Sequence, residues 1–400
     1  MRLQLTPVCT LAVLACGAPP PNGQDSDTGA DAETDLVDED GDGVPASEDC
    51  NDADSTRWIW GPNGGHLDLN TNSVGLFCDH YCSAGWVDRL WIRDTGVSSL
   101  VGLECIQEVV GDVRIERNEV LTSVEGLSNL QSVGGAFYLD ANPGLENLDD
   151  IGQLEFIGSG LHISNHANLV QFDSLASMDT PGTVSLFNND ALTSVGGLLG
   201  VTLPANLFID DNDALEQLDD LALSLQGDGQ LFVTGNDNLT QINGLAGLSG
   251  SLAGLQITDN AALTQLDGLL GVTEVTGSLT VENNPLLQHL DGLGSLTGTV
   301  GSLSLGYNDA LTGLDGLSGV SQIDTVTVIG NPTLTDLNGL TGLEEVIELF
   351  VYNNDALTDV SGLYQLTSGN LYFQGNASLT EQAVIDLIAE IDGTNVSYAP

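Results

Sequence analysis

From residue 113 onward, apolar and polar positions return in one pattern every 22 to 24 residues. Three copies read LQITDNAALTQLDGLLGVTEVTG (255–277), LTVENNPLLQHLDGLGSLTGTVG (279–301) and LFVYNNDALTDVSGLYQLTSG (349–369). Their shared core is L-x-[IV]-x-x-N-x-x-L-x-x-L-x-G-L. A fixed period in this range is typical of a solenoid, in which each repeat buries its apolar face only against its neighbours. The pattern predicts a mainly β solenoid of about thirteen coils, counting a degenerate first copy at 90–103.

Within one copy, the alternation in L-x-[IV] predicts a short strand with two side chains inward and one outward. The asparagine then turns the chain, and its amide can satisfy backbone groups buried in the turn. Stacked coil on coil, these side chains are expected to form a ladder, in which His166 is a member rather than a ligand. The ladder positions are Asn118, Asn142, His166, Asn189, Asn212, Asn236, Asn260, Asn284, Asn308, Asn331, Asn354 and Asn376.

The two ends of a solenoid need covers. Residues 57–112 are expected to supply an N-terminal cap with the degenerate first coil, residues 113–379 the repeats, and residues 380–400 a C-terminal cap. The segment TEQAVIDLIAEIDG (380–393) predicts a short amphipathic helix with Thr380 as N-cap and Gly393 as the stop. The apolar side chains expected to cover the last coil are Val384, Leu387, Ile388 and Ile391.

The repeat core, with the V-x-G that follows it at 275–277 and 299–301, carries a family resemblance. It resembles the receptor L domain repeats of growth-factor receptors and fungal wall proteins, and more loosely leucine-rich repeats. The resemblance covers about 290 of the 400 residues. It implies a solenoid whose faces bind partners, and it transfers no individual site residue to this chain.

Charge narrows the choice of partner. The chain has 6 Lys+Arg against 57 Asp+Glu, a formal net charge of −51. There is no lysine, and every arginine lies in the first third: Arg2, Arg57, Arg89, Arg93, Arg114 and Arg117. Because nucleic acids and anionic lipids are bound by clustered Lys and Arg, both are excluded as partners of the repeats. The acidity also suits a salt-rich habitat, which composition alone does not decide.

The N-terminus predicts export. Residues 1–16 have one basic residue, a short apolar run and small residues, the pattern of a signal peptide. Val13-Leu14-Ala15-Cys16 resembles the lipobox of bacterial surface lipoproteins, which implies lipidation of Cys16 and anchoring at the outer membrane or cell surface. An ordinary signal peptide cleaved nearby is the alternative. Residues 17–37 are polar and rich in Asp, Gly and Pro, and are expected to form a disordered acidic tether.

Four further cysteines agree with export: Cys50, Cys78, Cys82 and Cys105. An even number in an exported chain predicts two disulfides with three possible connectivities. The favoured interpretation pairs Cys50 with Cys78 and Cys82 with Cys105. A zinc site at C-D-H-Y-C (78–82) is the alternative.

The segment VDEDGDGVPASEDCND (37–52) has the spacing of a calcium loop. Counting from Asp38, acidic ligands fall at positions 1, 3, 5 and 12, with Gly43 at the sharp turn. The motif resembles the metal-binding motif of bacterial surface proteins and thrombospondin type 3 calcium repeats, which implies structural calcium within 38–56. Pro45 and the absence of flanking helical patterns argue against a sensor. The candidate ligands are Asp38, Asp40, Asp42, the Val44 carbonyl, Asp49, Asn51, Asp52 and Asp54.

The outward residue of each predicted strand forms a column along the solenoid: Trp91, Arg114, Tyr138, His162, Ser185, Phe208, Phe232, Gln256, Thr280, Ser304, Thr327, Phe350 and Tyr372. Aromatic side chains on a rigid sheet suit stacking on sugars or docking of a protein. Their β-propensity is the structural alternative. The candidate binding face consists of Trp91, Arg114, Tyr138, His162, Phe208, Phe232, Phe350 and Tyr372.

Basic residues gather at the first part of this column. The spacing places Arg89 beside Asp112 and Arg93 beside Glu116, with Arg114 between Trp91 and Tyr138. Cross-strand ion pairs with a cation–π contact are one interpretation. A site for an anion or a carboxylated glycan is the other.

Catalysis has weak support in the sequence. The pairs Asp149-Asp150, Asp210-Asp211 and Asp219-Asp220 could act in glycoside hydrolysis, but they fall at turn positions where Asp is common. Coils after Arg117 also lack the Lys or Arg that a lyase needs. The sequence therefore favours a non-catalytic module that binds a protein or glycan at the cell surface, with structural calcium. A secreted β-helical carbohydrate-active enzyme is the rival, and an ice-binding solenoid is weaker because Thr234, Thr258, Thr280 and Thr327 are spread over two columns.

Overall fold

The structure is a computed structural model that describes residues 66–69, 85–175, 178–180, 182–199, 201–203, 206–218, 221, 224–225, 229–391 and 394–400. The signal peptide with Cys16, the tether and the calcium-like loop lie outside these residues, as do Cys50, Cys78 and Cys82. Their predicted roles stay predictions. Cys105 is disulfide-bonded, and its predicted pairing with Cys82 stays a prediction too.

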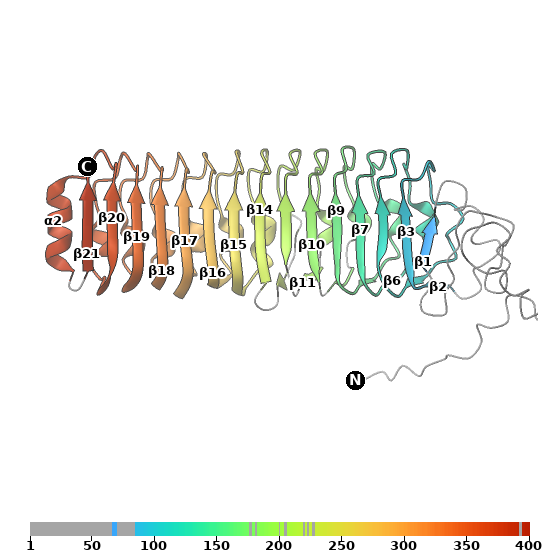
Figure 1. The fold of residues 1–400 in the computed structure, drawn as a ribbon, viewed down its shortest axis with the longest axis horizontal. Coiled ribbons are helices and arrows are strands. Elements are labelled where there is room, and N and C mark those ends of the chain that lie inside the picture. The colour runs from blue at the N-terminus through green and yellow to red at the C-terminus, as the bar shows by residue number, and fades with distance from the viewer. Residues whose placement is uncertain are drawn as a thin grey trace, which may run out of the picture.

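One long parallel sheet runs along the molecule, with its strands side by side in chain order (Figure 1). Among the described residues it has 15 strands. They are β1 (His66–Leu69), β3 (Arg89–Arg93), β5 (Val113–Glu116), β7 (Ala136–Asp140), β9 (Gly160–Ser164), β10 (Thr183–Phe187), β12 (Leu207–Asp210), β14 (Gly229–Thr234), β15 (Gly250–Thr258), β16 (Val272–Glu282), β17 (Gly298–Gly306), β18 (Val320–Ile329), β19 (Glu345–Tyr352), β20 (Ser368–Gln374) and β21 (Thr394–Ala399).

Shorter elements complete each coil. A small parallel sheet contains β2 (Trp86–Val87), β4 (Glu108–Val109), β6 (Ser132–Val133) and β8 (Phe156–Ile157), and a second contains β11 (Thr202–Leu203) and β13 (Ser224–Leu225). Short 3-10 helices carry the x-G-L end of the repeat: η3 (Glu125–Leu127), η4 (Asp149–Ile151), η5 (Asp173–Leu175), η6 (Gly196–Leu198), η7 (Asn243–Gly247), η8 (Asp267–Leu269), η9 (Asp291–Leu293), η10 (Asp315–Leu317), η11 (Asn338–Leu340) and η12 (Ser361–Leu363).

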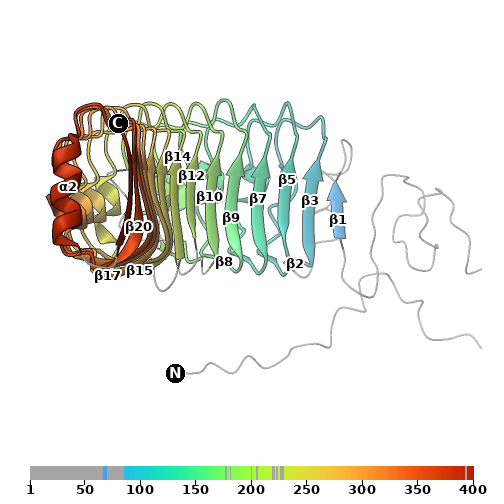
Figure 2. The ribbon, with the colours of Figure 1, turned by 60° about the vertical axis from the view of Figure 1, so that its left-hand side comes forward.

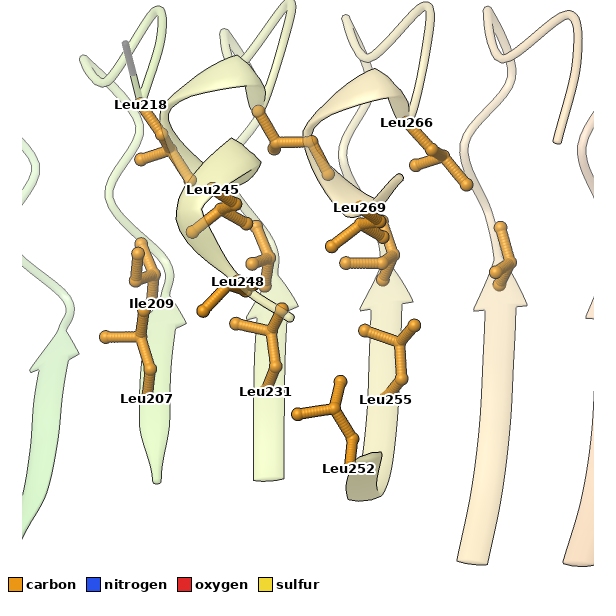
Figure 3. Close-up of a cluster of buried hydrophobic side chains, with 14 of the residues drawn as sticks. Leu207, Ile209, Leu218, Leu231, Leu245, Leu248, Leu252, Leu255, Leu266 and Leu269 are labelled. Carbon is orange, nitrogen blue, oxygen red and sulfur yellow. The ribbon is translucent and has the colours of Figure 1, made fainter. Parts of the chain in front are cut away.

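The core lies between the long sheet and the 3-10 helices. Leu231 of β14 and Leu255 of β15 point toward Leu245 and Leu269 of the helices (Figure 3). All four side chains are fully buried. Each coil thus contributes a layer of leucines that is covered by the layers before and after it, which accounts for the strict repeat period.

The strands of the C-terminal half are longer than the short strand that the repeat core predicts. β16 has 11 residues and β18 has 10, whereas β5 has 4. The segment before the core joins the sheet in these coils through shifts of register, as between Val275 and Ser278. Such irregularities let one strand continue around a bend.

The predicted ladder is confirmed. Every ladder residue is at most 1% exposed. At Asn260, the side-chain oxygen accepts from the backbone N–H of Asn236 at 3.2 Å, and the amide nitrogen donates to the Val233 carbonyl at 2.9 Å. The same links recur from coil to coil. The ladder also begins one coil earlier than predicted, because Thr95 donates to Asn118 through its backbone N–H and its hydroxyl.

His166 performs the asparagine's task with a ring. Its Nδ1 lies 3.3 Å from the backbone N of Asn142, its Nε2 lies 3.1 Å from the carbonyl of Leu139, and its own N–H donates to Asn189. Nδ1 also lies 3.0 Å from the Asn142 carbonyl oxygen. In the neutral tautomer with the proton on Nε2, Nε2 donates to Leu139 and Nδ1 accepts from the Asn142 N–H. Burial accordingly lowers the pKa of His166, against smaller opposing effects of the two backbone hydrogen bonds.

Because the pKa of His166 is lowered, this residue is expected to make the folded state less stable at acidic pH than at neutral pH. His166 binds fewer protons in the folded state than in the unfolded chain. Its contribution to the free energy of unfolding is therefore complete above about pH 6.5 and decreases as the pH falls below that value. Replacing His166 by Asn is expected to remove this loss, at most about 1.4 kcal/mol per pH unit. Urea unfolding at pH 7 and pH 5 measures it. An equal decrease in the free energy of unfolding from pH 7 to pH 5 in the wild type and in His166→Asn would contradict the prediction.

Helix α2 (Glu381–Glu390) covers the C-terminal end of the stack (Figure 2). As predicted, Thr380 is its N-cap and accepts from the backbone N–H of Ala383 at 3.2 Å. Leu387 is fully buried, but Ile388 is 50% exposed, so its predicted place over the last coil is wrong. Helical periodicity puts Ile388 on the far side of the helix, and the chain then returns as β21, an edge strand that the repeat pattern did not predict.

Candidate binding face

The strand register places the predicted outward residues in one line, here called the central column. Trp91 pairs with Arg114, Arg114 with Tyr138, and Tyr138 with His162. The line continues without a break to Phe350 and Tyr372. Every member is half-buried rather than fully exposed. Neighbouring side chains cover one another, so what faces solvent is mostly their outer edges.

At the N-terminal end, four members form a continuous stack, here called the N-terminal stack: Trp91, Arg114, Tyr138 and His162. The Arg114 guanidinium lies 4.1 Å from the Tyr138 ring centroid and 6.0 Å from that of Trp91. Tyr138 and His162 stack at 4.7 Å with an interplanar angle of 8°. Burial, with a smaller effect of Arg114, lowers the pKa of His162. A neutral imidazole suits this place because it can stack as an aromatic ring beside a cation.

Carboxylates neutralise the stack from the same strand. Arg114 contacts Asp112 at 3.7 Å and Glu116 at 3.4 Å, both two residues away on its own strand face. The strand register also confirms the predicted place of Arg93 beside Glu116, and the Arg93 guanidinium lies 5.5 Å from the Trp91 ring centroid. A hollow of about 220 Å³ lies beside the guanidinium, lined by Trp91, Arg93, Arg114 and Glu116. The Arg114 Nε is itself buried and has no hydrogen-bond partner among the described residues.

A separate ion pair stiffens the turn next to this stack. The Arg117 guanidinium donates to both carboxylate oxygens of Asp94 in the preceding coil, at 2.9 and 2.7 Å. Both residues have a positive φ and occupy the position just before a ladder residue. The hydrogen bond from Arg117 lowers the pKa of Asp94. The pair is exposed, so its geometry orders the turn but adds little to stability.

In the middle of the face, Phe208 and Phe232 lie 5.0 Å apart. Asp210 follows Phe208 on the same strand face and pairs with Phe187 and Thr234 of the adjacent strands. Burial raises the pKa of Asp210 to about 6, opposed by a hydrogen bond from Thr234 and helped by the charge of Asp211. Burial thus makes the Asp210 carboxyl less acidic than a free aspartate.

At the C-terminal end, Phe350 stacks on Tyr372 at 5.0 Å with an interplanar angle of 13°. Tyr352, on the same strand as Phe350, has its ring 5.8 Å away. Tyr352 was missed by sequence reasoning, as were Ile329 and Phe187, because only the central residue of each strand was considered. All three lie two residues further along, in a second outward column that the period-2 rule would have found.

The acidic pairs do not converge on a groove in the described part of the chain. Asp149 and Asp150 begin η4, a 3-10 helix away from the sheet face. Asp210 is on the face, but Asp211 is in the turn with a positive φ. Asp219 and Asp220 lie outside the described residues. The placement agrees with a conformational role for Asp in turns.

No group of three or more His, Cys, Asp and Glu side chains in the described part of the chain is arranged to hold a metal ion. The predicted calcium ligands, Asp38 to Asp54, are outside it. Among the described helices, none has the length and apolar character needed to cross a membrane.

The class of protein that this fold defines is a parallel β-solenoid with a core made mainly of leucine. No protein-family model matches the chain, and no curated protein matches it. Among solved structures, an internalin (InlF) from Listeria monocytogenes is 15% identical, with a TM-score of 0.37, over 78% of this chain and 87% of that one. The leucine-rich repeat domain of the type III effector XopL is 16% identical, with a TM-score of 0.28, over 65% of this chain and 76% of that one. With TM-scores this low, neither match bears on function.

Proposed function

We propose that the solenoid is a non-catalytic binding module that engages a protein or glycan partner at the cell surface through the outward face of the long sheet. Lipid anchoring at Cys16 and structural calcium at the tether junction are part of this proposal. The anchor would hold the module at the surface, and calcium would stiffen the segment between tether and cap.

The observation that carries the proposal is the N-terminal stack with its hollow. Trp91 and Tyr138 present the outer edges of their rings beside the hollow, and Arg114 has a buried Nε–H without a partner among the described residues. A polar group of a ligand could satisfy that donor while a ring or a sugar packs on Trp91. Four of the five arginines that follow the signal peptide lie in the first two of the four strands that build this stack or in the turn after them: Arg89, Arg93, Arg114 and Arg117.

The test is a double substitution, Trp91→Ser with Arg114→Gln, in the full-length protein. We expect binding to a glycan array or to cells to fall at least tenfold, because stacking and the guanidinium are lost together. The matched control is Thr280→Ser with Ser304→Ala, two adjacent positions of the central column whose other column neighbours, Gln256 and Thr327, are not aromatic. Circular dichroism checks the fold. Unchanged binding by the Trp91/Arg114 variant would refute the proposal.

A further inference from the structure

The opposite end of the sheet carries a second cluster, here called the C-terminal patch, of three aromatic rings and one aliphatic side chain: Phe350, Tyr352, Tyr372 and Ile329. Its members lie on three neighbouring strands, and all are half-buried. Phe350 contacts both tyrosines, at centroid distances of 5.0 and 5.8 Å. The patch therefore presents a compact group of π systems.

Within the central column, the Phe350 ring has a ring neighbour on one side only. In the central column Phe350 is followed on one side by Tyr372 and on the other by Thr327. Threonine is too small to cover a phenyl ring, and Ser304 beyond it is smaller still. The Phe350 face toward β18 is thus bordered by Thr327 and by Ile329 and Tyr352, which pair with each other.

The charge around the patch has a single sign. Glu348 lies two residues before Phe350 on the same strand face, paired with Thr325 and Asn370. No Lys or Arg occurs anywhere after Arg117, so no basic side chain of this chain is near in sequence to neutralise it. Rings beside an unneutralised carboxylate attract a cation both through the ring quadrupole and through charge.

In the N-terminal stack of the same sheet, a ring and nearby carboxylates are accompanied by a cation from the chain itself. There, Arg114 occupies the central-column position next to Tyr138, packs over the ring at 4.1 Å and contacts carboxylates of the same face. At the C-terminal patch the equivalent neighbour of Phe350 is Thr327. Ring and carboxylate are both present, and the cation is not supplied by the chain.

We infer that the C-terminal patch binds an arginine side chain presented by a basic partner protein. The guanidinium lies over Thr327 against the Phe350 ring, within reach of Glu348. Arginine is preferred to lysine because its planar group stacks on a ring while its N–H donors reach a carboxylate. The inference rests on the proposed binding role of the sheet face and adds a second contact point with its own chemistry.

A variant that supplies the cation internally tests this. Thr327→Arg places a guanidinium where the partner's would lie, and should block the site. Thr280→Arg makes the same change of charge in the same column, between Gln256 and Ser304 and without a ring beside it. The probe is a fluorescent peptide of alternating glycine and arginine, with glycine–lysine and glycine–glutamine peptides for comparison. Anisotropy is measured on the full-length protein.

We expect Thr327→Arg to weaken binding of the glycine–arginine peptide about tenfold, and Thr280→Arg less than about twofold. Phe350→Leu with Tyr372→Leu, which keeps the apolar bulk but removes the π systems, should also cost about tenfold. The lysine peptide should bind more weakly, and the glutamine peptide not measurably. All variants keep the N-terminal stack intact, so a failure here leaves the proposed function standing.

Two results would overturn the inference. Equal weakening by Thr327→Arg and Thr280→Arg would mean that the peptide is attracted only by the acidic surface as a whole. Wild-type affinity in the Phe350/Tyr372 leucine variant, with its fold verified by thermal unfolding, would mean that the rings do not contact the cation.

Discussion

Replacing Gly316 by Ala is expected to destabilise the solenoid by about 3–5 kcal/mol, a large loss for a single methyl group. Gly316 lies in η10, where the chain crosses the preceding coil at its closest approach. A β-carbon there would lie 1.8 Å from the carbonyl oxygen of Leu290, and that oxygen belongs to the backbone and cannot rotate away. The two coils would have to separate, opening the leucine layer between them.

The matched control is three residues away. A β-carbon on Gly313 would have no atom within 4 Å, so Gly313→Ala should change the free energy of unfolding by less than about 0.5 kcal/mol. Chemical denaturation of both variants measures the difference. Similar stabilities of the two variants would show that neighbouring coils can shift cheaply, contrary to the close packing described here.

Removing one ladder asparagine is expected to lower the free energy of unfolding by about as much as Gly316→Ala does. In Asn260→Ala the backbone N–H of Asn236 and the carbonyl of Val233 both lose their partner inside the protein. Each unsatisfied buried group costs about 1–3 kcal/mol, so a total loss of about 3–5 kcal/mol is expected. Thermal or denaturant unfolding measures it.

An exposed asparagine provides the comparison. Asn283 has a positive φ of 55° and lies just before the next ladder residue. Asn283→Gly keeps that conformation accessible and removes no buried hydrogen bond, so a change below about 0.5 kcal/mol is expected. A small loss in Asn260→Ala, comparable to that of Asn283→Gly, would mean that water replaces the amide in the ladder.

The repeat period explains why much of this fold could be predicted. Once Leu231 and Leu255 are known to be inward, and Asn236 and Asn260 to be ladder members, the period of 24 aligns every outward residue between them. The central column follows from this alignment alone. The same reasoning placed His166 in the ladder, because position outweighs residue type in a strict repeat.

The features that the sequence did not predict depend on contacts that occur once and are not repeated from coil to coil. Arg114 contacts the carboxylates two residues before and two residues after it in the chain, while its guanidinium packs on the Tyr138 ring. The edge strand β21 comes after the last copy and carries no repeat signal. The raised pKa of Asp210 depends on the burial created by its neighbours, which the letters alone do not give.

Because the strands of the long sheet are parallel and stacked in line, the two ends of the sheet are held at a fixed separation. The N-terminal stack and the C-terminal patch are held about 50 Å apart, at about 4.8 Å per strand. Because each coil contacts only its neighbours, gain or loss of a whole repeat in a gene would change that separation in fixed increments without altering either end. Copy number would then tune the spacing of epitopes that one solenoid can bridge on its partner.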